Sequence, residues 1–179
     1  MRPFAVLGVL AILSLLAVSS EVSDVVELVQ PSPNGIDQPE DYLNWRVLSV
    51  SSRSDNGTLR VILGNDVASS AAEAGETVPW PDGAILCKLV WKQVDNPGWP
   101  AAGVPGEFVH SEFMVKDSEL YESTGGWGFA RWLGLDQTPF GSDESFANSC
   151  FSCHLPMAEQ DYVFTHPAPV PSKTALVPD

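Results

Sequence analysis

The most strand-like segment of the chain is Ala84-Ile85-Leu86-Cys87-Lys88-Leu89-Val90-Trp91. Its aliphatic and aromatic residues fit a pleated, partly buried surface. The rigid turn Pro79-Trp80-Pro81-Asp82-Gly83 leads into it, and both features together predict a strand. The alternation of a strand places side chains on two faces. One face carries Leu86, Lys88 and Val90, and the other carries Cys87, Leu89 and Trp91.

Similar segments before and after this strand predict a sheet. Further strands are expected over residues 44–50, 59–63, 107–115 and 127–133, and residues 96–106 are expected to be turn-rich. A short Ala-rich helix, capped by Asn65 or Asp66, is expected to end at Gly75. A second helix is expected to begin at residues 142–143 and to run toward Cys150. The pattern predicts an α+β fold, mainly antiparallel β-sheet with a few short helices.

The composition of the 179 residues predicts one globular domain with an acidic surface. Hydrophobic residues make up 44% and charged residues 18% of the chain, which is typical of a folded protein. Nine Lys and Arg stand against 23 Asp and Glu, a formal charge of −14. A nucleic-acid binder needs clustered basic charge to neutralise phosphates, so this class is excluded. The negative surface would suit a cationic redox partner, such as a c-type cytochrome.

The first 20 residues are typical of a secretory signal peptide. Met1-Arg2 supplies a positive start, residues 4–16 are almost entirely apolar, and Ala17-Val18-Ser19 offers a small-residue cleavage pattern. A membrane anchor is the alternative, but the apolar run is shorter than the ~20 residues that span a bilayer. We therefore expect a periplasmic or secreted protein with no membrane span after cleavage.

Two of the three cysteines stand in the motif Cys150-Phe151-Ser152-Cys153-His154. This C-x-x-C-H spacing is the attachment signature of c-type haem. Two thiols one helical turn apart can meet the vinyl groups along one porphyrin edge, and the adjacent imidazole can reach the iron. A thioredoxin-like dithiol, which would be colourless, leaves the histidine without a role. Zinc would need a second ligand pair, and a plain disulfide could form in an exported protein.

The residue on the other face of the iron determines what a haem protein does. Met157 follows the motif histidine by three residues, so on a continuing helix it lies on the proximal side. His166 stands beside prolines and is expected to be a surface or packing histidine. His110 and Met114 share one strand face with Glu112, which we interpret as a polar face. The sequence therefore favours an open sixth coordination position.

Four sequence blocks resemble those of cytochrome P-460 proteins in order and spacing. They are Trp80-Pro81-Asp82-Gly83-Ala84-Ile85-Leu86-Cys87-Lys88-Leu89-Val90-Trp91-Lys92, Glu112-Phe113-Met114-Val115-Lys116-Asp117, Gly125-Gly126-Trp127-Gly128-Phe129 and the C-x-x-C-H motif. The resemblance covers residues 41–164, and we expect a haem domain at residues 41–166. The proline-broken segment 21–40 is expected to be a flexible arm, and residues 167–179 a Pro-rich tail.

The resemblance implies a homodimer of β-sheet subunits with the haem motif on the last helix. Each subunit would hold one covalent haem c through Cys150, Cys153 and the proximal iron ligand His154. Enzymes of this family oxidise hydroxylamine, to nitrous oxide or nitric oxide, and carry a lysine bonded to a meso carbon of the haem. By position that lysine is Lys88, with Lys92 on the same strand face as a rival. A lone lysine in an apolar strand either finds a special partner or extends toward solvent.

A related branch, cytochrome c-prime beta, leaves a second function open. It is similar in fold, lacks the lysine bond, and uses an apolar distal pocket to bind nitric oxide or transfer electrons. Active enzymes also place a carboxylate in the distal pocket as a proton acceptor, and Asp143 and Glu144 are candidates for it. Either residue could instead cap the helix that carries the motif. Arg131 is expected to pair with a haem propionate.

Overall fold

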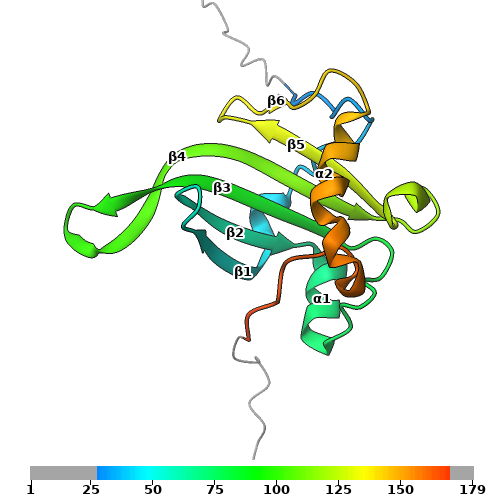
Figure 1. Ribbon diagram of the computed structural model, residues 1–179, viewed down its shortest axis with the longest axis horizontal. Helices are drawn as coiled ribbons and strands as arrows, with labels where there is room; N and C mark the ends of the chain where they lie inside the picture. The colour runs from blue at the N-terminus through cyan, green and yellow to red at the C-terminus, as the bar shows by residue number, and fades with distance from the viewer. Residues whose placement is uncertain (1–27, 170–179) are drawn as a thin grey trace, which may run out of the picture.

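In the part of the chain that the computed structural model describes, residues 28–169, six antiparallel strands form one sheet. The order of the strands across the sheet follows their order along the chain (Figure 1). The described residues also carry two short α-helices, which confirms the α+β class. The expected signal peptide, residues 1–20, and residues 170–179 of the expected tail lie outside the described residues.

The strands and helices follow one another with short connections. The strands are β1 (Arg46–Arg53), β2 (Thr58–Gly64), β3 (Ile85–Asn96), β4 (Trp99–Lys116), β5 (Trp127–Leu133) and β6 (Thr138–Pro139). The α-helices are α1 (Asp66–Ala74) and α2 (Phe146–His154), and the 3-10 helices are η1 (Tyr42–Asn44), η2 (Glu122–Thr124) and η3 (Leu155–Gln160). Within residues 28–169, no helix is long and apolar enough to cross a membrane.

Strands β3 and β4 continue as a two-stranded hairpin beyond the rest of the sheet (Figure 1). Their pairing reaches Asn96 opposite Trp99. Our expectation of a turn-rich segment at residues 96–106 is therefore wrong, because most of these residues form the first half of β4. Pro100 and Pro105 lie in this first half, before the residues that pair with β5. A proline is tolerated there because no second neighbouring strand needs its missing N–H.

The sheet register lines up charged side chains on one face of β3, β4 and β5. Lys88 lies opposite Glu112, which in turn lies opposite Arg131. Helices α1 and α2 cover this face, and the core beneath them includes Trp80, Leu86, Trp127 and Phe129. The other face carries a second core, which includes Cys87, Leu89, Phe113 and Trp132. The predicted division of the β3 side chains between two faces is confirmed.

The segment that we expected to be a flexible arm packs against the sheet over residues 30–38. The indole of Trp132 donates a hydrogen bond to the Gln30 carbonyl oxygen at 2.8 Å, and Asn34 Nδ2 donates to the Phe129 carbonyl oxygen at 2.9 Å. Ile36 is buried in the second core. These residues do not form a free arm, because packing against the apolar second face of the sheet removes that face from water.

Helix α1 begins and ends as its sequence predicts. The side chain of Asn65 accepts a hydrogen bond from Ala68 N at 3.0 Å, which caps the first turn. Gly75 ends the helix in the left-handed conformation, with φ 74°. The small residues Ala68 and Ala71 are buried against the sheet, so α1 lies close to the strands that line the site.

Candidate functional site

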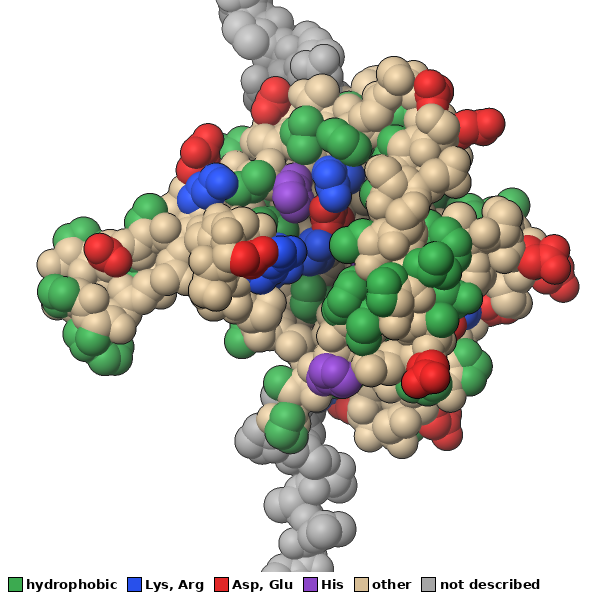
Figure 2. Space-filling model, viewed as in Figure 1, with side chains coloured by type: hydrophobic (Ala, Val, Ile, Leu, Met, Phe, Trp, Pro, Cys, Tyr) green, Lys and Arg blue, Asp and Glu red, His purple; other side chains and the backbone are tan. Residues whose placement is uncertain are grey.

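A cavity of about 740 Å³ lies between α2, the chain that follows it and the helix-covered face of the sheet. This volume is in the range of small-molecule and cofactor sites. Figure 2 shows basic, acidic and histidine side chains gathered in a hollow on this side of the molecule. Its apolar lining includes Leu86, Met114 and Phe129. The cavity therefore combines an apolar wall with a concentrated set of charges.

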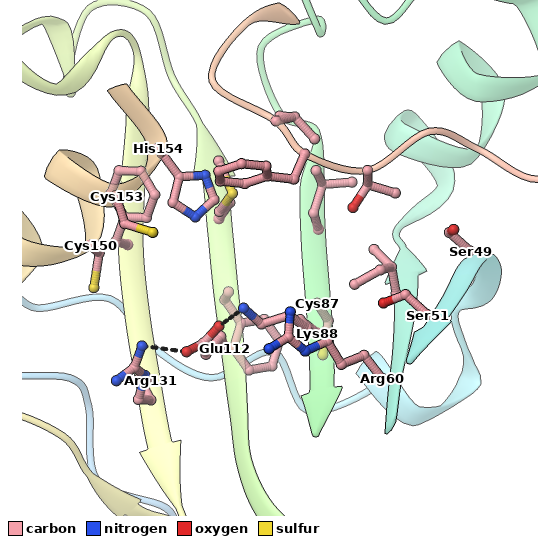
Figure 3. Close-up of a pocket in the computed structure, with 18 of the residues that line it drawn as sticks. Ser49, Ser51, Arg60, Cys87, Lys88, Glu112, Arg131, Cys150, Cys153 and His154 are labelled. Atoms are coloured by element: carbon pink, nitrogen blue, oxygen red, sulfur yellow. Dashed lines mark ion pairs between the residues drawn. The ribbon is translucent and has the colours of Figure 1, made fainter. Parts of the chain in front are cut away.

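Helix α2 brings the motif residues to one side of this cavity. Cys150, Cys153 and His154 all line it (Figure 3). The three cysteines of the chain are free thiols in the structure. Cys150 is half-buried, and burial raises the pKa of its thiol, whereas Cys153 is exposed. Two unbonded thiols one turn apart on a helix can both reach the same edge of a bound group.

The imidazole of His154 is oriented by a backbone carbonyl. Its Nδ1 lies 2.7 Å from the Tyr162 carbonyl oxygen, which fixes Nδ1 as the donor nitrogen and leaves the Nε2 lone pair free. The ring centroids of Phe129 and Phe164 lie 5.2 and 5.1 Å from the centroid of the His154 ring. Burial lowers the pKa of His154 despite this hydrogen bond, so the ring is neutral at pH 7. A neutral imidazole with a carbonyl-bound Nδ1 is the common form of a metal-ligating histidine.

Three charged side chains lie across the cavity from His154 (Figure 3). Glu112 forms ion pairs with Lys88 on β3 and with Arg131 on β5. The side chain of Glu112 is only 16% exposed. Burial alone would raise its pKa, but the attraction of Lys88 and Arg131 is greater in sum and lowers the pKa to about 2. Glu112 is therefore an ionised carboxylate at neutral pH.

His110 adds a neutral ring beside this carboxylate. Its Nε2 lies 3.3 Å from Glu112 Oε1. Burial lowers the pKa of His110 to about 4, helped by the nearby charges of Arg131 and Lys88, and the attraction of Glu112 does not offset this. The contact between His110 and Glu112 is therefore not an ion pair at pH 7.

The stability of the protein is expected to fall below pH 6.5 because of His110. In the unfolded chain this ring takes up a proton near pH 6.5, whereas in the folded chain it stays neutral to about pH 4. The contribution of neutral His110 to the free energy of unfolding is complete above pH 6.5. It is lost as the pH falls toward 4, by up to about 3 kcal/mol. Urea unfolding between about pH 7 and pH 4.5 should show this slope in the parent and a flatter one in His110→Gln. Equal slopes in the two proteins would contradict the assignment.

Glu112, rather than the carboxylates we expected, lies in the cavity. Asp143 and Glu144 are exposed in the loop before α2, and Asp143 Oδ1 accepts a hydrogen bond from Ser145 N at 2.9 Å. Glu112 was expected on a polar strand face, without a role in the site. Its position opposite Lys88 follows from the strand register, which the sequence alone does not fix.

Among the described residues, Lys88 lines the cavity and Lys92 does not. Lys92 is exposed four positions farther along β3. His166 is exposed at the edge of the cavity, and Met157 lies in η3 outside its lining. Arg131 lines the cavity and pairs with Glu112 through Nη2, and its Nε is buried without a hydrogen-bond partner among the described residues.

Basic and hydroxyl side chains line the end of the cavity that lies away from the cysteines. Arg60 on β2 and Ser49 and Ser51 on β1 occupy this end (Figure 3). Burial lowers the pKa of Arg60, and the repulsion of Arg53 adds to this, yet a guanidinium keeps its charge at pH 7. The Nε of Arg60 is buried without a hydrogen-bond partner among the described residues. A bound anionic group would supply that partner.

This arrangement of donors fits a haem. The two thiols face one end of the cavity and the unpaired Arg60 faces the other, as the vinyl and propionate edges of a porphyrin require. The free Nε2 of His154 can reach an iron, and Leu86 and Phe129 offer apolar contact to the ring.

Comparison with known proteins identifies the family of the chain. A search among curated proteins found no match. The family model described as Cytochrome P460 matches residues 39–165. The matched region holds the whole sheet, both α-helices and every residue of the haem-like site named above apart from His166. The chain belongs to the cytochrome P460 family.

Proposed function

We propose that this protein is a periplasmic c-type cytochrome that oxidises hydroxylamine, to nitrous oxide or nitric oxide. The observation that carries the proposal is the charged group Lys88, Glu112 and Arg131 across the cavity from His154. The alternative is a nitric oxide binder or electron carrier of the cytochrome c-prime beta kind, which would use an apolar surface at this place. A proton acceptor beside the open side of the iron favours catalysis.

Four residues would hold one haem per chain. Cys150 and Cys153 would form thioether bonds to the vinyl groups, and His154 would ligate the iron through Nε2. The Nε of Arg60 and that of Arg131 are both buried without a hydrogen-bond partner among residues 28–169. Arg60 replaces Arg131 as our candidate for the propionates, because Arg131 pairs with Glu112 and Arg60 lies away from the cysteines. A guanidinium binds a carboxylate through two parallel hydrogen bonds.

The side chains across the cavity would handle protons. The bound haem would supply an open coordination position and would pass electrons on to an external acceptor. Glu112 is ionised and accepts protons released by hydroxylamine. Arg131 holds one oxygen of Glu112, which keeps the carboxylate aimed into the cavity. His110, neutral and 3.3 Å from the same oxygen, can carry a proton onward.

Lys88 is our candidate for the covalent link to the porphyrin. The support is that its Nζ pairs with Glu112 inside the cavity instead of extending to bulk solvent.

Replacing Lys88 is expected to change the optical spectrum of the haem. Matured in a host that attaches haem, the reduced parent should show a red-shifted, broadened main band. Lys88→Ala should revert to an ordinary c-type spectrum, because the extra bond to the ring is lost. Lys92→Ala is the matched control, since Lys92 lies on the same strand but outside the cavity lining. Identical spectra for the parent and Lys88→Ala would remove the cross-link, and nitric oxide binding without hydroxylamine turnover would favour the alternative function.

We further propose a homodimer and a cationic redox partner. The β3–β4 hairpin exposes Val94 and Trp99, whose side chains would be covered in an oligomer. The formal charge of −14 would attract a basic c-type cytochrome.

A further inference from the structure

A buried ion pair lies behind His154, outside the lining of the cavity. Lys116 Nζ, at the end of β4, lies 2.7 Å from Asp161 Oδ1 and 2.9 Å from Oδ2. The two side chains are 6% and 9% exposed. The backbone N–H of Trp80 also donates to Asp161 Oδ2 at 2.8 Å. Burying two charges costs more than burying apolar residues of the same size, so such a pair is better explained by what it positions than by stability.

The ion pair holds an unusual turn in place. Asp161 and Tyr162 adopt left-handed φ angles of 52° and 62°, which residues with a Cβ atom rarely do and which surrounding contacts must maintain. The indole of Trp127 donates to the Asp161 carbonyl oxygen at 2.8 Å. The next carbonyl of the same turn, that of Tyr162, is the one 2.7 Å from His154 Nδ1. Lys116 and Trp127 therefore fix the turn that orients the imidazole.

Two glycines complete the support on the other side of the turn. Gly125 is left-handed, with φ 70°, and a Cβ atom there would clash with the Tyr162 ring. A Cβ atom on Gly126 would lie 3.2 Å from Lys116 Nζ. The Gly125 carbonyl oxygen also accepts from Lys116 Nζ at 3.4 Å. The glycine pair leaves the space that the Tyr162 ring and the ammonium group fill.

We propose that Lys116 and Asp161 are positioning residues for His154, acting through the Tyr162 carbonyl. The inference rests on the proposed function, because it requires His154 to ligate a haem iron. A fixed acceptor for Nδ1–H holds one tautomer and makes the imidazole a stronger electron donor. A stronger donor favours ferric over ferrous iron. By holding the Tyr162 carbonyl against His154, Lys116 and Asp161 would therefore keep the reduction potential of the haem low.

The test uses haem-loaded protein and two readouts besides activity: the iron–histidine stretching band of the ferrous protein in resonance Raman spectra, and the reduction potential. Asp161→Asn and Lys116→Met are each expected to lower the frequency of this band, or to split it, and to raise the reduction potential. The double variant should match the single variants, because the two residues act as a unit. Lys116→Arg, which keeps the charge, should partly restore both values.

Gly125→Ala tests the same carbonyl while keeping both charged side chains, since its methyl group would displace the Tyr162 ring. It should shift the band in the same direction even if Asp161→Asn fails to fold. Trp132→Phe is the control, because it loosens the core on the other face of the sheet and should leave band and potential unchanged.

The outcomes separate this inference from the proposed function. Attached haem with parental band and potential in Asp161→Asn and Lys116→Met would overturn the inference alone, as would an equal shift in Trp132→Phe. A parent protein without covalent haem would overturn the proposed function, and the inference with it.

Discussion

In the Lys88→Ala background, which lacks the proposed lysine link, the double variant Cys150→Ala/Cys153→Ala is expected to retain no covalently bound haem. Both thiols are free and line the cavity on the same side as His154, so each can form one thioether bond. With one thiol left, a single bond should remain and the haem should be held weakly. With neither, His154 alone would hold a dissociable group.

The measurement is haem staining on a denaturing gel, together with the spectrum of the extracted pigment. Cys87→Ala provides a matched control within the same chain. Cys87 is fully buried in the core on the other face of the sheet, and burial raises the pKa of its thiol, so it is an unreactive group. The Cys87→Ala variant should keep its covalent haem. Full covalent retention in the double variant would show that the motif has another role.

Glu112→Gln is expected to lower hydroxylamine oxidation by about 10²–10⁴-fold, the usual contribution of a positioned proton acceptor. The amide has the same shape but cannot take a proton. Haem attachment should persist, because Glu112 lies across the cavity from the cysteines and His154 (Figure 3). The rate should be measured as hydroxylamine-dependent reduction of an external acceptor under substrate saturation.

The exposed carboxylates before α2 give the controls for this experiment. Asp143→Asn and Glu144→Gln should keep the parental rate, because both side chains lie outside the cavity lining. A parental rate in Glu112→Gln, with a large loss in Glu144→Gln, would return the role of proton acceptor to the loop.

The candidate site was predictable where its residues lie close together in the chain. The motif that holds Cys150, Cys153 and His154 is a local helical pattern, and one turn of helix is enough to bring the three groups together. Lys88 was predicted as the cross-linking lysine from its position in the sequence block 80–92, which resembles cytochrome P-460 proteins. Glu112 was missed as an acceptor because its meeting with Lys88 depends on how two strands pair, and a shift of one residue would turn it to the other face.

The fold shows the same division between local and distant interactions. The caps of α1 and the range of β5 follow from local sequence and are confirmed. The length of the β3–β4 hairpin and the packing of residues 30–38 were not predicted. Prolines and glycines in these segments are typical of loops, but a long partner strand and an uncovered apolar face override that local preference.

The order of residues alone established an antiparallel α+β fold, a haem-type motif and membership of a family, because each of these depends on short-range spacing. Folding in three dimensions was needed to pair Glu112 with Lys88 and Arg131, to leave Arg60 with a buried and unpaired nitrogen, and to set Lys116 and Asp161 behind His154. The physical reason is that charges interact over a few ångströms whatever their separation along the chain. Strand register and the packing of distant segments, and not sequence spacing, bring these charges together.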